Sequence, residues 1–200
     1  MCIKQINVGF DNFSYIIFDK EDHVAAIVDP SYEIKDAIDF LRKNNLDLKY
    51  IINTHHHNDH TSKNYDIKKL YPKSKLIVSK ENLKGDLKVS DDYEIKIGKQ
   101  FLHFILTPGH TQDGICIIVN NKAILTGDTL FIGNCGRTDL LDGDINNMFE
   151  SLQRIKKLSD DLIIYPGHNY GNKPYDTLAN QKKTNQTLIA KNIDEFLKIS

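Results

Sequence analysis

Short apolar runs alternate with polar turns along most of the chain, and this pattern predicts strands joined by tight turns and helices. The predicted strands are rich in β-branched and aromatic residues and are bounded by polar or glycine-containing segments. They lie at 15–18, 24–28, 49–52, 76–78, 95–97, 101–106, 115–119, 123–125 and 162–165. The polar segments 19–22 and 120–121, between neighbouring strands, predict two hairpins.

Apolar residues at helical spacing predict helices between and after these strands. The helices are expected at 29–44, from after 60 through 70, at 148–158, and in a tail from about 177 to 200. No repeat, low-complexity tract or Pro/Gly/Ser-rich linker divides the sequence, so we expect residues 1–200 to form a single domain with a short helical tail. Two sheets with helices outside them, a layered α/β architecture, are the predicted fold class.

Composition excludes several classes of protein without identifying a function. The 200 residues include 26 basic and 27 acidic side chains, so the net charge gives no reason to expect a nucleic-acid or membrane partner. No apolar run approaches the roughly 20 residues that cross a bilayer, and the first residues lack the apolar stretch of a signal peptide. Three unevenly spaced cysteines predict no disulfide framework. We therefore expect a soluble cytoplasmic protein, whose oligomeric state the sequence leaves open.

The densest chemical signal is the segment 54–60, Thr-His-His-His-Asn-Asp-His, which directly follows a predicted strand. In an extended segment His55, His57 and Asp59 alternate toward one side, while His60 points elsewhere. One loop can therefore offer ligands to two adjacent metal positions, with the imidazole and carboxylate groups that borderline ions accept. The alternative, a polar turn with solvated histidines, is less favoured because three imidazoles gather where a strand ends. The intervening His56 is expected to point away.

Three further segments carry polar side chains at the ends of predicted strands, where functional groups gather in α/β proteins. They are 107–111 (TPGHT), 126–129 (TGDT) and 165–168 (YPGH). Each one alone has a structural explanation, as a hydrogen-bonded turn histidine or a capping aspartate. The repeated Pro-Gly-His changes this balance, because the same tight turn presents an imidazole twice. Five histidines and two aspartates together suit a two-metal site: His55, His57, Asp59, His60, His110, Asp128 and His168.

The motifs THHHNDH, TPGHT, TGDTLF and PGHNY, in this order, resemble those of the metallo-β-lactamase fold superfamily, in particular its glyoxalase II-like branch. The resemblance runs from about residue 8 to at least residue 170. It implies an αββα four-layer sandwich with a metal site along one edge of the sheets. It also implies two divalent metal ions, with zinc as the first candidate and iron or manganese as alternatives. The first would be bound by His55, His57 and His110, the second by Asp59, His60 and His168, with Asp128 bridging both.

The same resemblance implies a dinuclear hydrolase of a small thioester or related acyl compound. A water between two divalent ions loses a proton near neutral pH, and the hydroxide attacks the carbonyl. Asp59, a ligand beside that hydroxide, is expected to act as a catalytic residue that orients it or passes a proton. Thr54, Thr111 or backbone carbonyls are expected to hold the imidazoles in position.

Two further residues point to the substrate. Arg137 and Tyr170 match positions that hold glutathione in glyoxalase II, so they are the predicted substrate-binding residues and a glutathione conjugate is one candidate substrate. Asp139 stands where that family has a second tyrosine. A structural alternative for Arg137 is a turn residue that pairs with Asp139 or Asp142. Glyoxalase II also has a longer helical C-terminal domain, and compact glyoxalase II-like hydrolases are the nearest overall match.

Two alternatives to the hydrolase remain open. The segment 134–139 also resembles persulfide dioxygenases, which bind one iron through residues that match His110, Asp128 and either His55 or His57. Asn169 stands where those enzymes usually have aspartate, which counts against this alternative. The third possibility is a metal-binding protein without catalytic turnover. A metal count combined with thioester and persulfide substrates separates the three.

Overall fold

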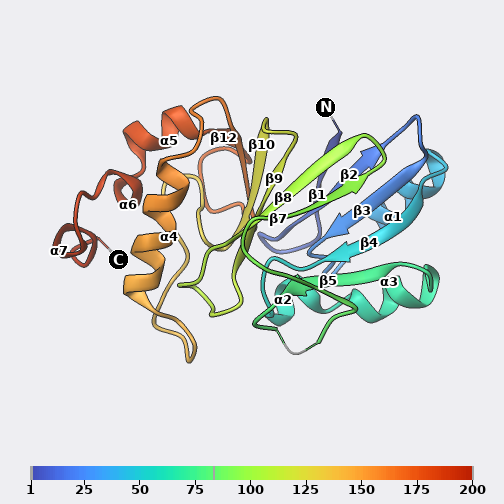
Figure 1. The fold of residues 1–200 in the computed structure, drawn as a ribbon, viewed down its shortest axis with the longest axis horizontal. Helices are drawn as coiled ribbons and strands as arrows, with labels where there is room; N and C mark the ends of the chain where they lie inside the picture. Colours follow the sequence, from blue (N-terminus) through green and yellow to red (C-terminus); the bar gives the residue numbers. More distant parts are fainter. Residues whose placement is uncertain (1, 83, 200) are drawn as a thin grey trace.

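Two mixed sheets form the centre of the computed structural model, which describes residues 2–82 and 84–199 (Figure 1). The first sheet consists, in spatial order, of β1 (Ile3–Asn7), β2 (Phe13–Asp19), β3 (Val24–Val28), β4 (Asp47–Ile52), β5 (Lys75–Ser79) and β6 (Leu87–Val89). The second consists of β7 (Tyr93–Ile97), β8 (Gln100–Leu106), β9 (Ile115–Val119), β10 (Ala123–Gly127), β11 (Ile163–Pro166) and β12 (Asp176–Thr177).

Turns and helical connections account for the direction of most neighbouring strands; β5 and β6 are parallel although only residues 80–86 separate them. The tight turns predicted at 19–22 and 120–121 join β2 to β3 and β9 to β10 as antiparallel pairs. Longer helical connections join β3 to β4, β4 to β5 and β10 to β11 as parallel pairs, because a parallel pair needs a crossover. In the second sheet β8, β10 and β11 therefore all run in one direction.

Helices cover the outer face of each sheet, which gives the four layers that the resemblance implies (Figure 1). On the first sheet these are α1 (Lys35–Lys43) and α3 (Asn64–Leu70). On the second they are α4 (Ile145–Lys156), α5 (Leu178–Thr184), α6 (Gln186–Ile189) and α7 (Ile193–Phe196). The one-turn helix α2 (Asn58–Thr61) lies in the loop after β4. Among the described residues, no helix is long and apolar enough to cross a membrane.

Alternating side chains divide the apolar residues between the central and outer layers. On β2, Tyr15 and Ile17 lie between the two sheets, while Ile16 and Phe18 pack against the helices of the first sheet. Since a strand turns successive side chains to opposite faces, a strand covered on both faces is apolar throughout. This explains why the sequence shows short continuous apolar runs instead of a strict polar–apolar alternation.

The predicted helix at 29–44 begins too early. Asp29 and Tyr32 have left-handed backbone angles, with φ of 51° and 39°, and α1 starts only at Lys35. Asp29 instead continues the pairing of β3 with β4, since its N–H donates to Ile52 O at 2.9 Å, and its side chain is buried. The Asp-Pro-Ser sequence is a typical helix start by local rules, but tertiary contacts of Asp29 decide its conformation.

Three short edge strands and the breaks in the tail were also missed. β1 and β6 are the two edge strands of the first sheet, and β12 is an edge strand of the second. All three carry few consecutive apolar residues. The tail from about 177 is helical as predicted but divides into α5, α6 and α7, since Asn185 and Asn192 each cap a new helix start.

Candidate metal centre

The candidate ligands lie at strand ends that meet on one edge of the two sheets. His55 and His57 follow β4, and Asp59 and His60 belong to α2 directly after it. In the second sheet His110, Asp128 and His168 follow β8, β10 and β11, which run in one direction and so end at the same edge. Backbone hydrogen bonds join the sheets there, among them those from Ile115 N to Thr54 O (2.8 Å) and from Phe13 N to Gly167 O (2.9 Å).

Both Pro-Gly-His turns need glycine because their surroundings leave no room for a side chain. A Cβ on Gly109, whose φ is +145°, would lie 2.4 Å from the Met148 Cα. A Cβ on Gly167 would lie 2.3 Å from Asp128 Oδ1. Glycine at 167 thus lets the turn bring His168 directly against the Asp128 carboxylate.

Three imidazole nitrogens converge to form the first ligand group. His55 Nε2 and His57 Nδ1 are 3.1 Å apart, and His57 Nδ1 and His110 Nε2 are 3.0 Å apart. Nitrogens bound tetrahedrally to zinc at its usual bond length lie about 3.3 Å from one another. The three nitrogens therefore lie close enough to hold a single ion, and they are the set that the family resemblance implies for the first position.

The second ligand group consists of two imidazoles and a carboxylate. His60 Nε2 lies 3.2 Å from His168 Nε2, and Asp59 Oδ2 lies 3.6 Å and 3.4 Å from these two nitrogens. Asp128 stands between the two groups: its Oδ1 is 3.3 Å from His60 Nε2 and its Oδ2 is 3.5 Å from His110 Nε2. The chemistry of this donor set suits a second divalent ion, with Asp128 in reach of both.

A buried carboxylate that the sequence reasoning missed holds members of both groups. Asp29 Oδ2 lies 3.0 Å from His60 Nδ1 and accepts a hydrogen bond of 2.6 Å from Thr54 Oγ1, which is itself 3.1 Å from His55 Nδ1. Asp29 Oδ1 accepts a third, from Thr54 N, at 2.8 Å. Partners of this kind fix the orientation and tautomer of a ligating imidazole. The signal was present in the sequence, since Asp29 directly follows a predicted strand as the ligands do.

The remaining imidazoles are held in different ways. His110 Nδ1 lies 2.8 Å from the backbone carbonyl of Arg137. Thr54 and a backbone carbonyl, two of the partners considered from the sequence, therefore each contact a ligand imidazole. The hydroxyl of Thr111 has no hydrogen-bond partner among the described residues. The ring of His168 stacks on Tyr170, with centroids 4.7 Å apart and planes at 7°.

His56 belongs to a different environment from its two neighbours. Its Nδ1 lies 2.9 Å from Asp113 Oδ1, and its Nε2 lies 3.7 Å from Asp142 Oδ2. Asn82 donates a hydrogen bond of 2.7 Å to the other oxygen of Asp113. His56 therefore makes its polar contacts with Asp113 and Asp142, outside the two converging groups, and its ring lies next to that of His57, with centroids 5.0 Å apart.

Burial favours the neutral form of two imidazoles of the first group, His55 and His57. It lowers the pKa of His55 well below the ordinary value, and the nearby His60 and His110 add to this effect. Burial also lowers the pKa of His57, with His110 as a second cause. Neutral imidazole is the form that binds a metal ion, so these two side chains are in the binding form at neutral pH.

The second group instead holds protons. Burial opposes a charge on His60, but Asp128 and Asp29 outweigh it and raise the pKa of His60 well above its ordinary value. Burial likewise opposes a charge on His168, yet its contacts with Asp128 and Asp59 raise the pKa of His168 to about 9. A divalent ion entering this group must displace these protons.

We therefore expect the two positions to differ in the pH dependence of metal binding. Because His60 and His168 are protonated below their raised pKa values, affinity at the second position should rise steadily from about pH 6 to about pH 8, with proton release. Affinity at the first position should change little over that range. Calorimetric titration in buffers of different ionisation enthalpy measures the protons released. A second ion that binds without releasing protons would contradict the expectation.

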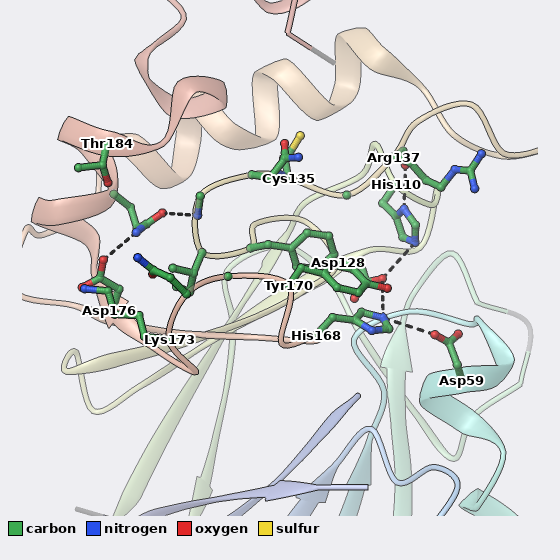
Figure 2. A pocket seen from close by; sticks show the side chains of 18 of the residues that line it. Asp59, His110, Asp128, Cys135, Arg137, His168, Tyr170, Lys173, Asp176 and Thr184 are labelled. Atoms are coloured by element: carbon green, nitrogen blue, oxygen red, sulfur yellow. Dashed lines mark hydrogen bonds and ion pairs between the residues drawn. The ribbon is translucent and has the colours of Figure 1, made fainter. Parts of the chain in front are cut away.

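Both ligand groups open into one pocket of about 1100 Å³. Figure 2 shows Asp59, His110, Asp128 and His168 at one end, and Lys173, Asp176 and Thr184 at the other. The segments 131–137 and 170–173 form its sides, and α5 closes the far end. A ligand whose reacting atom lies at the metal centre has room for an extended arm along this pocket.

A family model described as "Metallo-beta-lactamase superfamily" matches residues 8–168. The chain belongs to this superfamily. Hydroxyacylglutathione hydrolase from Pelagibacter ubique is 36% identical, over 98% of this chain and 84% of the relative. The human mitochondrial persulfide dioxygenase ETHE1 is 31% identical, over 94% of this chain and 75% of the relative. The crystal structure of ETHE1 from Myxococcus xanthus matches with a TM-score of 0.91 and 27% identity, covering 100% of this chain and 89% of that one.

These relatives confirm the fold and the family that the motifs predicted. Members of the metallo-β-lactamase superfamily are metal-dependent, which agrees with the clustered histidine and aspartate side chains of this chain. The hydrolase relatives support an enzyme. Hydrolase and dioxygenase relatives are similarly close, so the comparisons alone do not choose between these two activities.

The two predicted substrate-binding residues of this superfamily member lie at the pocket in different ways. Tyr170 lines it, packed edge-on against Phe131 as well as stacked on His168. Arg137 also lines it, but its side chain extends away from Asp128 in Figure 2. Arg137 Nε and Nη2 donate to the two oxygens of Asp139 at 2.6 Å and 2.7 Å, the pairing that the sequence offered as its structural alternative.

Proposed function

We propose that the protein is a dinuclear metal-dependent hydrolase of small thioesters. The observation that carries this proposal is the second ligand group, in which Asp59, His60 and His168 converge beside the first group and share Asp128 with it. This group offers two imidazoles and a carboxylate to a second ion, which a two-metal mechanism requires. The hydroxyacylglutathione hydrolase relatives support a thioester as the substrate class.

Two divalent ions, when bound, would supply an activated water and polarise the substrate carbonyl, and zinc is the first candidate. His55, His57 and His110 would hold one ion, and Asp59, His60 and His168 the other, with Asp128 shared. The orientation of the ligand imidazoles depends on other side chains of the protein. The buried carboxylate of Asp29 fixes the ring of His60, and Thr54 fixes that of His55.

Asp59 is the proposed catalytic residue among the chain's own groups. Its carboxylate lines the pocket, and Asn12 Nδ2 donates to its Oδ2 at 3.2 Å and to its carbonyl at 3.1 Å. Burial opposes ionisation, but His168, His60 and Asn12 hold the pKa of Asp59 below its usual range. An ionised carboxylate fixed at the pocket wall can orient a water by accepting a hydrogen bond from it.

One specific arrangement favours a second candidate, a persulfide dioxygenase that uses one iron. His110 Nε2 lies 3.0 Å from His57 Nδ1 and 3.5 Å from Asp128 Oδ2, so it has an imidazole on one side and a carboxylate on the other. Two histidines and one carboxylate are typical ligands of non-haem iron that activates oxygen. The dioxygenase relatives favour the same candidate.

The metal content and a substrate panel together test the proposal. Protein purified from its native host is expected to contain two divalent ions per chain and to hydrolyse thioesters, measured by release of free thiol. One iron per chain, with oxygen uptake on a persulfide and no thiol release, would replace the hydrolase by the dioxygenase. Bound metal without turnover of either substrate class would indicate a non-catalytic metal-binding protein.

A further inference from the structure

The far part of the pocket is where the thiol arm of a substrate would lie. The scissile carbonyl must reach the two ligand groups, and the pocket continues from there to Lys173, Asp176 and Thr184 (Figure 2). The charges along this path therefore select the kind of thiol that the enzyme accepts. This inference rests on the proposed thioester hydrolase function.

Among the described residues that line the pocket, the cations other than imidazoles are Arg137 and Lys173, and each is paired within the chain. The guanidinium of Arg137 makes two parallel hydrogen bonds to Asp139, at 2.6 Å and 2.7 Å. Lys173 Nζ lies 2.9 Å from Asp176 Oδ1. Neither cation is left to balance a negative charge on a ligand.

The pair at the far end is held firmly. Asp176 is buried, and its Oδ2 accepts hydrogen bonds from Asn180 Nδ2 at 2.6 Å and from Gln181 Nε2 at 2.7 Å. Gln181 Oε1 in turn accepts from Gly133 N at 2.8 Å, which ties α5 to the opposite side of the pocket. Asp176 is therefore fixed in place, and Lys173, whose side chain is half-exposed, must leave this carboxylate to meet a charged ligand.

The ion pair nearer the metal centre, between Arg137 and Asp139, is weaker, but its two residues are close in the sequence. Arg137 and Asp139 are both exposed, and an exposed ion pair contributes little. However, Asp139 is only two residues away and binds both ends of the guanidinium fork, so a ligand carboxylate must displace a tethered competitor. Asp139 therefore reduces the attraction of Arg137 for any anionic arm.

Neutral polar groups line the same path. The side chains of Asn58, Asn134 and Asn172 belong to the pocket wall, and Tyr170 adds an aromatic face. Amide side chains offer both donors and acceptors, which match the amide groups of an uncharged thiol such as pantetheine.

We propose that this enzyme acts on thioesters of an uncharged, amide-bearing thiol, and that Asp139 disfavours thiols with carboxylates by occupying Arg137. A glutathione arm carries two carboxylates, and Arg137 and Lys173 would have to leave their partners to meet them. A pantetheine arm requires no such exchange.

The experiment compares two matched probes on the metal-loaded protein. The value of kcat/KM is measured with acetylpantetheine and acetylglutathione. Calorimetry gives the Kd of S-propylpantetheine and S-propylglutathione, which cannot be hydrolysed. The pantetheine compounds are expected to be favoured by roughly tenfold in both measurements, because the glutathione carboxylates meet no free cation. Asp139→Asn frees Arg137 and should improve the glutathione compounds about three- to fivefold, with the pantetheine compounds unchanged.

Two further variants identify the cause. Asp142→Asn removes the same charge from the same loop but leaves Arg137 paired, so it should not improve the glutathione compounds. In the double variant Arg137→Gln/Asp139→Asn the gain should disappear. Equal or tighter binding of S-propylglutathione by the unaltered protein, or no gain in Asp139→Asn, would overturn the inference. If neither acetyl thioester is hydrolysed, the proposed function fails, and the two Kd values still decide the preference for an uncharged arm.

Discussion

Replacing His60 by alanine is expected to leave one metal ion per chain and to lower thioester hydrolysis by at least about a thousandfold. His60 is fully buried, and its Nε2 lies within 3.6 Å of Asp59, Asp128 and His168, so its removal disrupts the second ligand group at its centre. The first group, which does not use His60, should still bind its ion. Metal analysis of the dialysed protein and a thiol-release assay measure the two effects.

His56→Ala is the matched control, because it removes a neighbouring imidazole that faces Asp113 and not the ligand groups. It should retain two ions and nearly full activity. Circular dichroism of both variants separates loss of metal from loss of fold. Full hydrolysis by His60→Ala with a single ion bound would show that the two-metal mechanism is wrong.

Asp29→Asn is expected to weaken metal binding by about 10- to 100-fold and to lower the free energy of unfolding by about 2–3 kcal/mol. Asp29 accepts from Thr54 N and Thr54 Oγ1 and faces His60 Nδ1, while the asparagine amide would turn a donor toward one of these groups. His60 and, through Thr54, His55 would both lose their orientation. A competitive chelator titration measures the metal affinity, and denaturant unfolding measures the stability.

Asp19→Asn controls for the loss of a buried charge. Asp19 is also buried and accepts hydrogen bonds from Lys99 N and Gln100 Nε2, which are the main causes that lower its pKa to about 2. It lies at the end of β2, outside both ligand groups, so this variant should lose stability but keep its metal affinity. Equal metal affinity in Asp29→Asn and the unaltered protein would show that Asp29 does not position the ligands.

Much of this protein is determined by its sequence alone. Continuous apolar runs such as 115–119 predict buried strands because both faces of each sheet are covered, and the turn at 120–121 predicts their hairpin. The seven candidate ligands follow from short motifs at strand ends, and the structure gathers all seven at one edge of the sheets. Such features are local, so neighbouring residues suffice to reveal them.

Only the tertiary structure decided which groups hold these ligands and what the pocket offers a substrate. Asp29 reaches His60 across 31 positions of the sequence, and strand pairing and register bring them together. The left-handed conformation of Asp29 also overrides the helix start that local rules predict there. The pairing of Arg137 with Asp139, one of two possibilities in the sequence, depends on the path of the loop. Side-chain contacts between distant segments depend on how the whole chain packs, and no local pattern contains that information.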